Sequence, residues 1–128
     1  MSVLMKEIIL SPAFPQLPTG DVEKTAQFFV TLLGFEIVAK YPEQKFLIVR
    51  RGLAEIHFWQ AESDAEAKNL GSASSCYIRV ENIELLFQEF KKRHVKFRYE
   101  LTKQSWGMLE MQVDDPYLNA IKFGQVSV

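Results

Sequence analysis

The feature that most constrains this chain is an order of local patterns that occurs twice: a strand, a helix and three strands. The residues Asp21-Val22-Glu23 match Asn82-Ile83-Glu84, and both sets begin an amphipathic segment. Phe29 matches Phe90 at the same offset, and later Ile56-His57-Phe58 matches Ile121-Lys122-Phe123. A pattern repeated in this way predicts a duplicated unit. We therefore expect an α+β fold made of two βαβββ modules.

Periodicity and turn residues set the predicted elements. Apolar residues at helical spacing predict helices that begin after Asp21 and Asn82, both residue types that favour an N-cap. Gly34 follows the first helix, where a C-terminal glycine is common. Alternating Ile, Val, Phe and Tyr predict the strands, which we place at 13–18, 36–41, 45–51, 54–60, 74–80, 95–101, 108–114 and 120–126.

The length of 128 residues suits one domain. We place the domain at 1–128, the first half at about 12–60 and the second at about 74–126. The connector, about 61–73, carries Ser63 and Glu66 at the spacing of a capping box. A short helical turn and a plain solvated loop are equally good predictions for this segment.

Charge and cysteine content exclude several classes of protein. The net charge is −1, so no basic excess is present to neutralise phosphates, and we expect no nucleic-acid partner. Cys76 is the single cysteine, which excludes an internal disulfide and a cysteine zinc site. The apolar run near the N-terminus is too short for a secretory core or a membrane span. We expect a cytoplasmic protein with no membrane partner and with Cys76 buried and reduced.

Four segments carry a resemblance to a known family. These are PQLPTGDVEKTAQFFVTLLGF, KFLIVRRGLAEIHFW, SCYIRVENIELLFQEF and SWGMLEMQVDDPYLNAIKFGQ. In this order they resemble the glyoxalase/bleomycin-resistance family of the vicinal oxygen chelate superfamily, and its bleomycin-resistance branch most of all. The resemblance implies that the modules form an incomplete barrel around a cleft. It also implies a homodimer that binds a drug stoichiometrically in crevices between subunits, without destroying it.

The enzymes of this superfamily bind a divalent metal at four strand positions, which fall here on Phe14, His57, Ser75 and Lys122. Phe14 has no donor atom, Ser75 is a poor ligand, and the ammonium of Lys122 repels a cation. Catalytic zinc sites keep three protein ligands, so one histidine predicts no metal, no cofactor and no catalytic residue. His57 has two interpretations that the sequence leaves equal: contact with a ligand in the cleft, or a satisfied structural histidine.

Strand alternation and the family's crevice positions give a predicted binding surface. Its residues are Phe14, Phe46, His57, Trp59, Tyr77, Trp106 and Glu110. Aromatic faces stack on flat heteroaromatic groups and attract cations, as a bleomycin-like drug requires. Core packing is the alternative for each aromatic residue. Arg79 and Lys122 oppose a cationic ligand if they share this side.

Three functions follow as hypotheses. The first is sequestration of a bleomycin-like drug by a homodimer without catalysis. The second is a metal-dependent lyase, transferase or dioxygenase whose ligands would be His57, Glu55 and Glu110. The third is a binding module for an unknown metabolite, either anionic or neutral.

Overall fold

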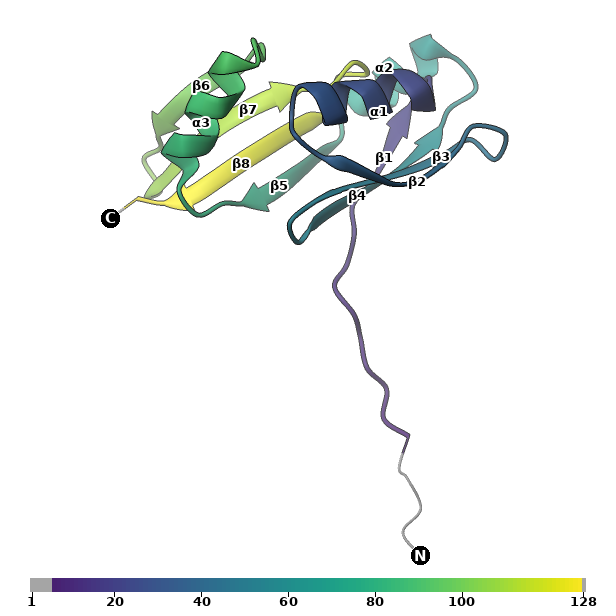
Figure 1. Cartoon of the computed structure of the whole chain (residues 1–128), viewed down its shortest axis with the longest axis horizontal. Coiled ribbons are helices and arrows are strands. Elements are labelled where there is room, and N and C mark those ends of the chain that lie inside the picture. The colour runs from purple at the N-terminus through teal and green to yellow at the C-terminus, as the bar shows by residue number, and fades with distance from the viewer. Residues whose placement is uncertain (1–5, 128) are drawn as a thin grey trace, which may run out of the picture.

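The computed structural model describes residues 6–127, and it contains the βαβββ order twice (Figure 1). The first module consists of β1 (Gln16–Thr19), α1 (Val22–Thr31), β2 (Glu36–Tyr41), β3 (Phe46–Arg51) and β4 (Ala54–Gln60). The second consists of β5 (Ser75–Arg79), α3 (Ile83–Lys92), β6 (Tyr99–Lys103), β7 (Met108–Asp114) and β8 (Ala120–Val126). The helix α2 (Asp64–Gly71) connects the two modules.

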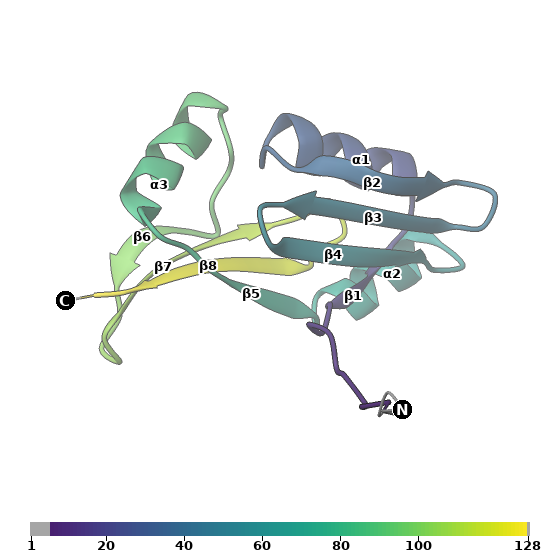
Figure 2. The same cartoon turned by 60° about the horizontal axis from the view of Figure 1, so that its bottom comes forward.

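Each module forms one mixed four-stranded sheet. The strand orders are β1-β4-β3-β2 and β5-β8-β7-β6, with β1 parallel to β4, β5 parallel to β8 and all other pairs antiparallel. In Figure 1 α1 lies over the first sheet and α3 over the second, on the same side of the molecule. The opposite side of each sheet carries no helix, as the turned view in Figure 2 also shows for the first sheet. The predicted α+β fold of two βαβββ modules is confirmed.

Two predicted strands begin three or four residues later in the structure, while those predicted at 45–51 and 74–80 begin one residue later. The first begins at Gln16 rather than at residue 13, since Pro12 and Pro15 have no N–H to donate to a ladder. The strand predicted at 95–101 begins at Tyr99, because the Val95 N–H closes the end of α3 by donating to the Phe90 carbonyl. In the connector the helical alternative is right: Ser63 Oγ accepts the Glu66 N–H at 3.1 Å.

The N-caps of the two equivalent helices differ. Asp21 caps α1 by accepting the N–H groups of Glu23 and Lys24. Asn82 has a left-handed backbone and makes no side-chain cap, so the prediction that it caps α3 is wrong in this respect. Instead Gln125, near the end of β8, accepts the Ile83 N–H at 2.9 Å.

One apolar core runs through both modules. The inward faces of the strands supply residues such as Phe58 and Phe123, which pack on Phe29 of α1 and Phe90 of α3 at ring-centroid distances of 5.2 and 5.3 Å. These residues belong to a single buried cluster. Phe29 and Phe90, matched in the sequence, therefore occupy equivalent places beneath their helices.

Polar contacts fix the modules to each other at two places. The Arg51 guanidinium donates to both carboxylate oxygens of Glu89 at 2.7 and 2.9 Å and to the Leu33 carbonyl at 2.9 Å. This pairing raises the pKa of Arg51 and lowers the pKa of Glu89. At the other place Asn119 Nδ2, in the loop between β7 and β8, donates to the Pro18 carbonyl at 2.8 Å. These contacts hold the two modules against each other.

Residues 6–15 precede β1 without helix or strand and extend away from the body of the protein (Figure 1). The prediction about a secretory core rests partly on residues 1–5, which lie outside the described residues. Within 6–127 no helix is long and apolar enough to cross a bilayer.

Candidate ligand-binding site

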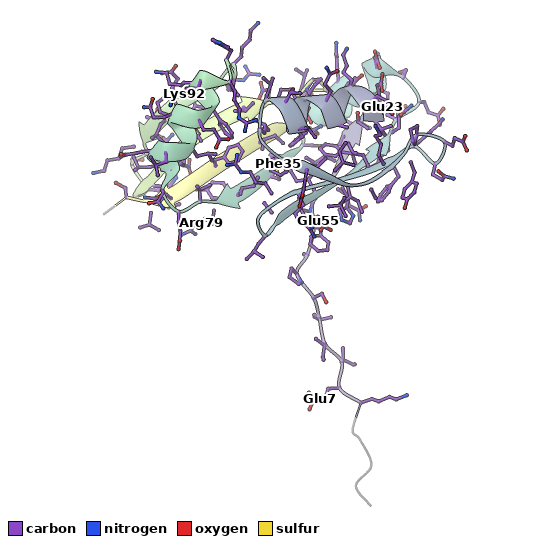
Figure 3. The ribbon with its side chains drawn as sticks, in the orientation of Figure 1. Glu7, Glu23, Phe35, Glu55, Arg79 and Lys92 are labelled. Carbon is purple, nitrogen blue, oxygen red and sulfur yellow. The ribbon has the colours of Figure 1, made fainter. Side chains whose placement is uncertain are left out.

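The aromatic and polar side chains of the predicted binding surface lie on the helix-free side of each sheet, which we call the open face. In β4 the side chains of Ile56 and Phe58 are buried beneath α1, while Glu55, His57 and Trp59 alternate with them on the open face. Figure 3 shows Glu55 on the side opposite Glu23 of α1. The predicted alternation of this strand is therefore confirmed by its burial pattern.

His57 is the centre of the cluster on the first open face. Its Nε2 lies 2.7 Å from Glu55 Oε2, within hydrogen-bond distance. The Phe14 ring stacks on the imidazole with centroids 5.1 Å apart, and Phe46 meets its edge at 5.8 Å. The contact with Glu55 agrees with a satisfied structural histidine, and contact of His57 with a ligand stays a prediction. Trp59 is opposite Phe46 across the β3–β4 pair and is 40% exposed.

Glu110 is the centre of the cluster on the second open face, and it is 5% exposed. The Tyr77 hydroxyl donates to its Oε2 at 2.6 Å, and Trp106 Nε1 donates to the same oxygen at 3.4 Å. Burial and the contact with Glu110 raise the pKa of Tyr77 to about 12, and burial also raises the pKa of Tyr99. The arrangement holds a desolvated carboxylate behind two aromatic side chains, and Trp106 is 65% exposed.

Gly124 is part of this second cluster and was not predicted from the sequence. A Cβ at this position would collide with the Tyr77 hydroxyl, so only glycine lets the Tyr77 ring cross β8 to reach Glu110. A glycine inside a strand often marks such a close approach. That signal was present in the motif Lys122-Phe123-Gly124, but it does not say which side chain approaches.

Two cations share the second open face. Lys122 lies opposite Tyr77 in the β5–β8 register and opposite Gln112 in the β7–β8 register. Arg79 is two residues after Tyr77 in β5 and is exposed. Arg79 and Lys122 therefore share this face, where they oppose a cationic ligand. Together with Glu110 they give the second open face both positive and negative charge.

The metal-binding positions of the enzymes do not fit a metal here. Phe14 contributes a phenyl ring against His57, and Lys122 contributes an ammonium. Ser75 pairs with Ala120, while the neighbour of Lys122 is Tyr77. The alternative ligand set is also divided, because Glu55 and His57 are on the first sheet and Glu110 is on the second. Among residues 6–127 no three His, Cys, Asp or Glu side chains gather at metal-binding distance.

The predicted surface thus falls into two clusters within one chain. Phe14, Phe46, His57 and Trp59 lie together on the first module, and Tyr77, Trp106 and Glu110 lie together on the second. Among the described residues, no hydrogen bond or aromatic contact joins one cluster to the other. Each open face therefore presents aromatic surface and a carboxylate.

The fold and these two faces define a paired-module βαβββ protein of the glyoxalase-like fold. A family model described as Glyoxalase/Bleomycin resistance protein/Dioxygenase superfamily matches residues 11–123. The chain belongs to this superfamily.

Its relatives include proteins of drug resistance. A bleomycin resistance protein of Geobacillus stearothermophilus is 31% identical over 128 residues, covering 88% of this chain and 95% of that protein. The bleomycin-binding protein of Streptomyces verticillus, solved in complex with copper(II)-bleomycin, is 26% identical, with a TM-score of 0.75 over 95% of this chain and 99% of that one. A bleomycin resistance determinant encoded on the transposon Tn5 has a TM-score of 0.78 at 24% identity, covering 93% and 100% of the two chains.

Proposed function

We propose that this protein binds a bleomycin-like drug, or a ligand that is similarly planar and cationic, and holds it without chemical change. The site is a crevice between two copies of the chain, with the first open face of one copy opposite the second open face of the other. Residues 1–128 act as one domain in this assembly, and the protein works in the cytosol.

The observation that carries the proposal is the Glu110 cluster. A buried carboxylate attracts a cation more strongly than an exposed one, because less water screens it. Trp106 and Tyr77 offer ring faces beside it, and a well-placed aromatic pair contributes about 0.5–1.5 kcal/mol beyond area burial. Cation–π contact adds about 0.5–2 kcal/mol. A flat cationic heteroaromatic group matches all three side chains.

The exposure of the aromatic side chains supports the proposal of a second copy. Trp59, Tyr77 and Trp106 each expose 40% or more of their surface on open faces that no helix covers. The two clusters complement each other, since the first offers Phe14 and Phe46 for stacking while the second offers the buried acid. A crevice that joins them encloses a ligand from both sides.

The proposal of binding without turnover rests on the side chains at the four positions that bind a metal in related enzymes. Three of the four positions that bind the metal in related enzymes carry a phenyl ring, a hydroxyl and an ammonium. In addition, the imidazole of His57 is engaged by Glu55. These residues support orientation and enclosure of a ligand, but they do not assemble a nucleophile with a base.

Titration with bleomycin by calorimetry tests the function. We expect one drug per chain, and we expect Trp106→Ala and Glu110→Gln each to weaken binding about tenfold or more, since a hydrogen bond or ion pair to a charged group contributes about 1.5–3 kcal/mol. Glu23→Gln is the matched control, because Glu23 is an exposed acid on the helix side that pairs with Lys40. Absence of binding at high micromolar drug defeats the drug assignment.

A second candidate function is binding of an anionic or neutral metabolite, and the specific observation for it is Lys122 with Arg79 on the second open face. A thermal-shift screen separates the candidates, since a ligand at 100 times its Kd stabilises a protein by about 2.7 kcal/mol. Under this candidate we expect a metabolite to raise Tm, Lys122→Gln to abolish the rise, and bleomycin to leave Tm unchanged. A shift with bleomycin that Lys122→Gln preserves contradicts it.

A further inference from the structure

A row of three aromatic side chains crosses the first open face. In the antiparallel register Tyr41 of β2 lies opposite Phe46 of β3, and Phe46 lies opposite Trp59 of β4. Residues directly opposite each other in adjacent strands project from the same face of a sheet, so all three are on the open face. Figure 2 shows β2, β3 and β4 side by side, with β2 at the outer edge of the sheet. We call these three residues the aromatic row. Tyr41 is not part of the surface predicted from the sequence.

The rings of the aromatic row are accessible to a ligand. Tyr41 and Trp59 are 53% and 40% exposed, and Phe46 is partly buried. None of the three belongs to the buried apolar cluster. Phe46 meets the edge of the His57 ring, and among the described residues no ring contact joins Phe46 to Tyr41 or Trp59. Apolar surface gathered in one exposed place marks a site of interaction, and the ring faces of this row are free to provide one.

The equivalent row of the second module is polar. There Thr102 of β6 lies opposite Glu110 of β7, and Glu110 lies opposite Gly124 of β8. The strands β6, β7 and β8 repeat the topology of β2, β3 and β4. In addition, Trp59 and Gly124 each follow the matched isoleucine of their module by three residues. The two rows therefore occupy equivalent places, and the first offers stacking surface where the second offers a carboxylate.

The spacing of the aromatic row sets the length of ligand that it fits. Adjacent strands lie about 4.8 Å apart, so Tyr41 lies about 10 Å from Trp59 across β3. One six-membered ring is too short to contact both ends of the row, whereas two flat rings linked in line reach all three side chains. Stacking on each ring face is favourable. A positive charge on such a ligand matches Glu110 on the opposite wall of the proposed crevice.

We propose that the aromatic row makes the site selective for cationic ligands with two flat rings linked in line, and that Tyr41 is the residue that determines this selectivity. The inference rests on the proposed function, because it uses the first open face as one wall of the crevice. It adds the length of the ligand and a residue at the outer edge of the sheet. The rings stack on the aromatic row, and Glu110 of the partner subunit receives the charge.

Binding of two matched cations tests the proposal. N-methylpyridinium and N-methyl-4-phenylpyridinium carry the same charge and differ by one ring, and each is titrated into the full chain and followed by NMR spectroscopy. We expect the wild type to bind the two-ring cation more tightly. Tyr41→Ala is expected to weaken binding of this cation about two- to tenfold, the effect of one well-placed aromatic pair, and to leave the one-ring cation unchanged. Tyr41→Phe keeps the ring and is expected to keep the preference.

Ile37→Ala is the matched control in the same strand. Ile37 lies opposite Val49, which is buried in the core beneath α1, so Ile37 is on the helix side of β2. It is 42% exposed, close to the exposure of Tyr41. We expect this variant to bind both cations as the wild type does. Both sites are on the surface, so circular dichroism is expected to show the wild-type fold in each variant.

Several results overturn the proposal. These are equal binding of the two cations by the wild type, no binding of the two-ring cation at millimolar concentration, an equal loss of both cations in Tyr41→Ala, and a loss in Ile37→Ala as large as in Tyr41→Ala. The proposed function is judged separately with bleomycin. If bleomycin does not bind while the preference for two rings is intact, only the drug assignment fails. If Tyr41→Ala binds bleomycin and the two-ring cation as the wild type does, only the present inference fails.

Discussion

Gly71→Ala is expected to lower the free energy of unfolding by about 3 kcal/mol, near the upper end for an overpacked site. Gly71 is the last residue of α2 and is buried. A Cβ there would collide with the carbonyl oxygen of Tyr117 in the β7–β8 loop and would press on the Asn119 N–H. The obstacle is backbone, which cannot turn aside as a side chain can, so α2 and the loop must separate.

Urea denaturation followed by circular dichroism measures this effect. Asn69→Ala is the matched control, since Asn69 is exposed two residues earlier in the same helix and an alanine there meets no obstacle. We expect the control to change stability by less than about 0.5 kcal/mol. A Gly71→Ala protein as stable as the control would show that α2 does not pack on the loop in this way.

The stability of the protein is expected to fall by about 3 kcal/mol between pH 4 and pH 6 through one carboxyl group, Asp115. This side chain is 3% exposed, and burial raises its pKa from 3.8 to about 6. One pKa unit corresponds to about 1.36 kcal/mol. Because the folded pKa is the higher one, the folded state binds the proton more tightly. The stabilisation is complete below pH 4 and is lost as pH rises through 6.

The measurement compares the pH dependence of unfolding in the wild type and in Asp115→Asn. Asp115 accepts the N–H groups of Tyr117 and Asn119 at 2.9 and 3.0 Å. An asparagine does not titrate and retains the oxygen that accepts these two N–H groups, while its amide nitrogen replaces the oxygen that accepts Asn119 Nδ2. Other carboxyls titrate equally in the two proteins, so the difference between the two slopes isolates Asp115. Parallel curves over pH 4–6.5 would contradict the assignment.

Both effects concern the β7–β8 loop, which joins the modules. Asp115 accepts Asn119 Nδ2 at 2.8 Å, and the same Asn119 amide donates to the Pro18 carbonyl in the first module. Tyr117 donates to Asp64 of α2 at 3.3 Å. The loop thus holds the second module against β1 and α2. Damage to it is expected to reduce stability and to change the relative placement of the two open faces.

Most of the fold was predictable because its signals are local. Strand bounds at 36–41, 54–60, 108–114 and 120–126 match the predicted ones, since alternation and turn residues act within a few residues of each other. The error at the start of α3 has a non-local cause. Asn82 does not cap α3, because Gln125 reaches its first N–H from a strand 42 residues away. No pattern near Asn82 could show this contact.

The candidate site was predictable as a set of residues and not as an arrangement. Alternation placed Glu55, His57 and Trp59 on one face of β4, as the burial pattern confirms. The sequence did not show that Glu110 accepts from Tyr77 and Trp106, or that Gly124 makes room for Tyr77. These contacts join separate strands and a turn, so they depend on how the strands pair.

The sequence by itself determined the two βαβββ modules, the side of each strand that carries the chemistry and the lack of metal donors at three positions. Periodicity, capping residues and side-chain chemistry depend only on the order of the residues, so the sequence alone reveals them. The tertiary structure decided that the aromatic and acidic residues form two separate clusters, one on each module. Packing through the shared core and the Arg51–Glu89 pair sets these relations, because they join residues that lie far apart in the sequence.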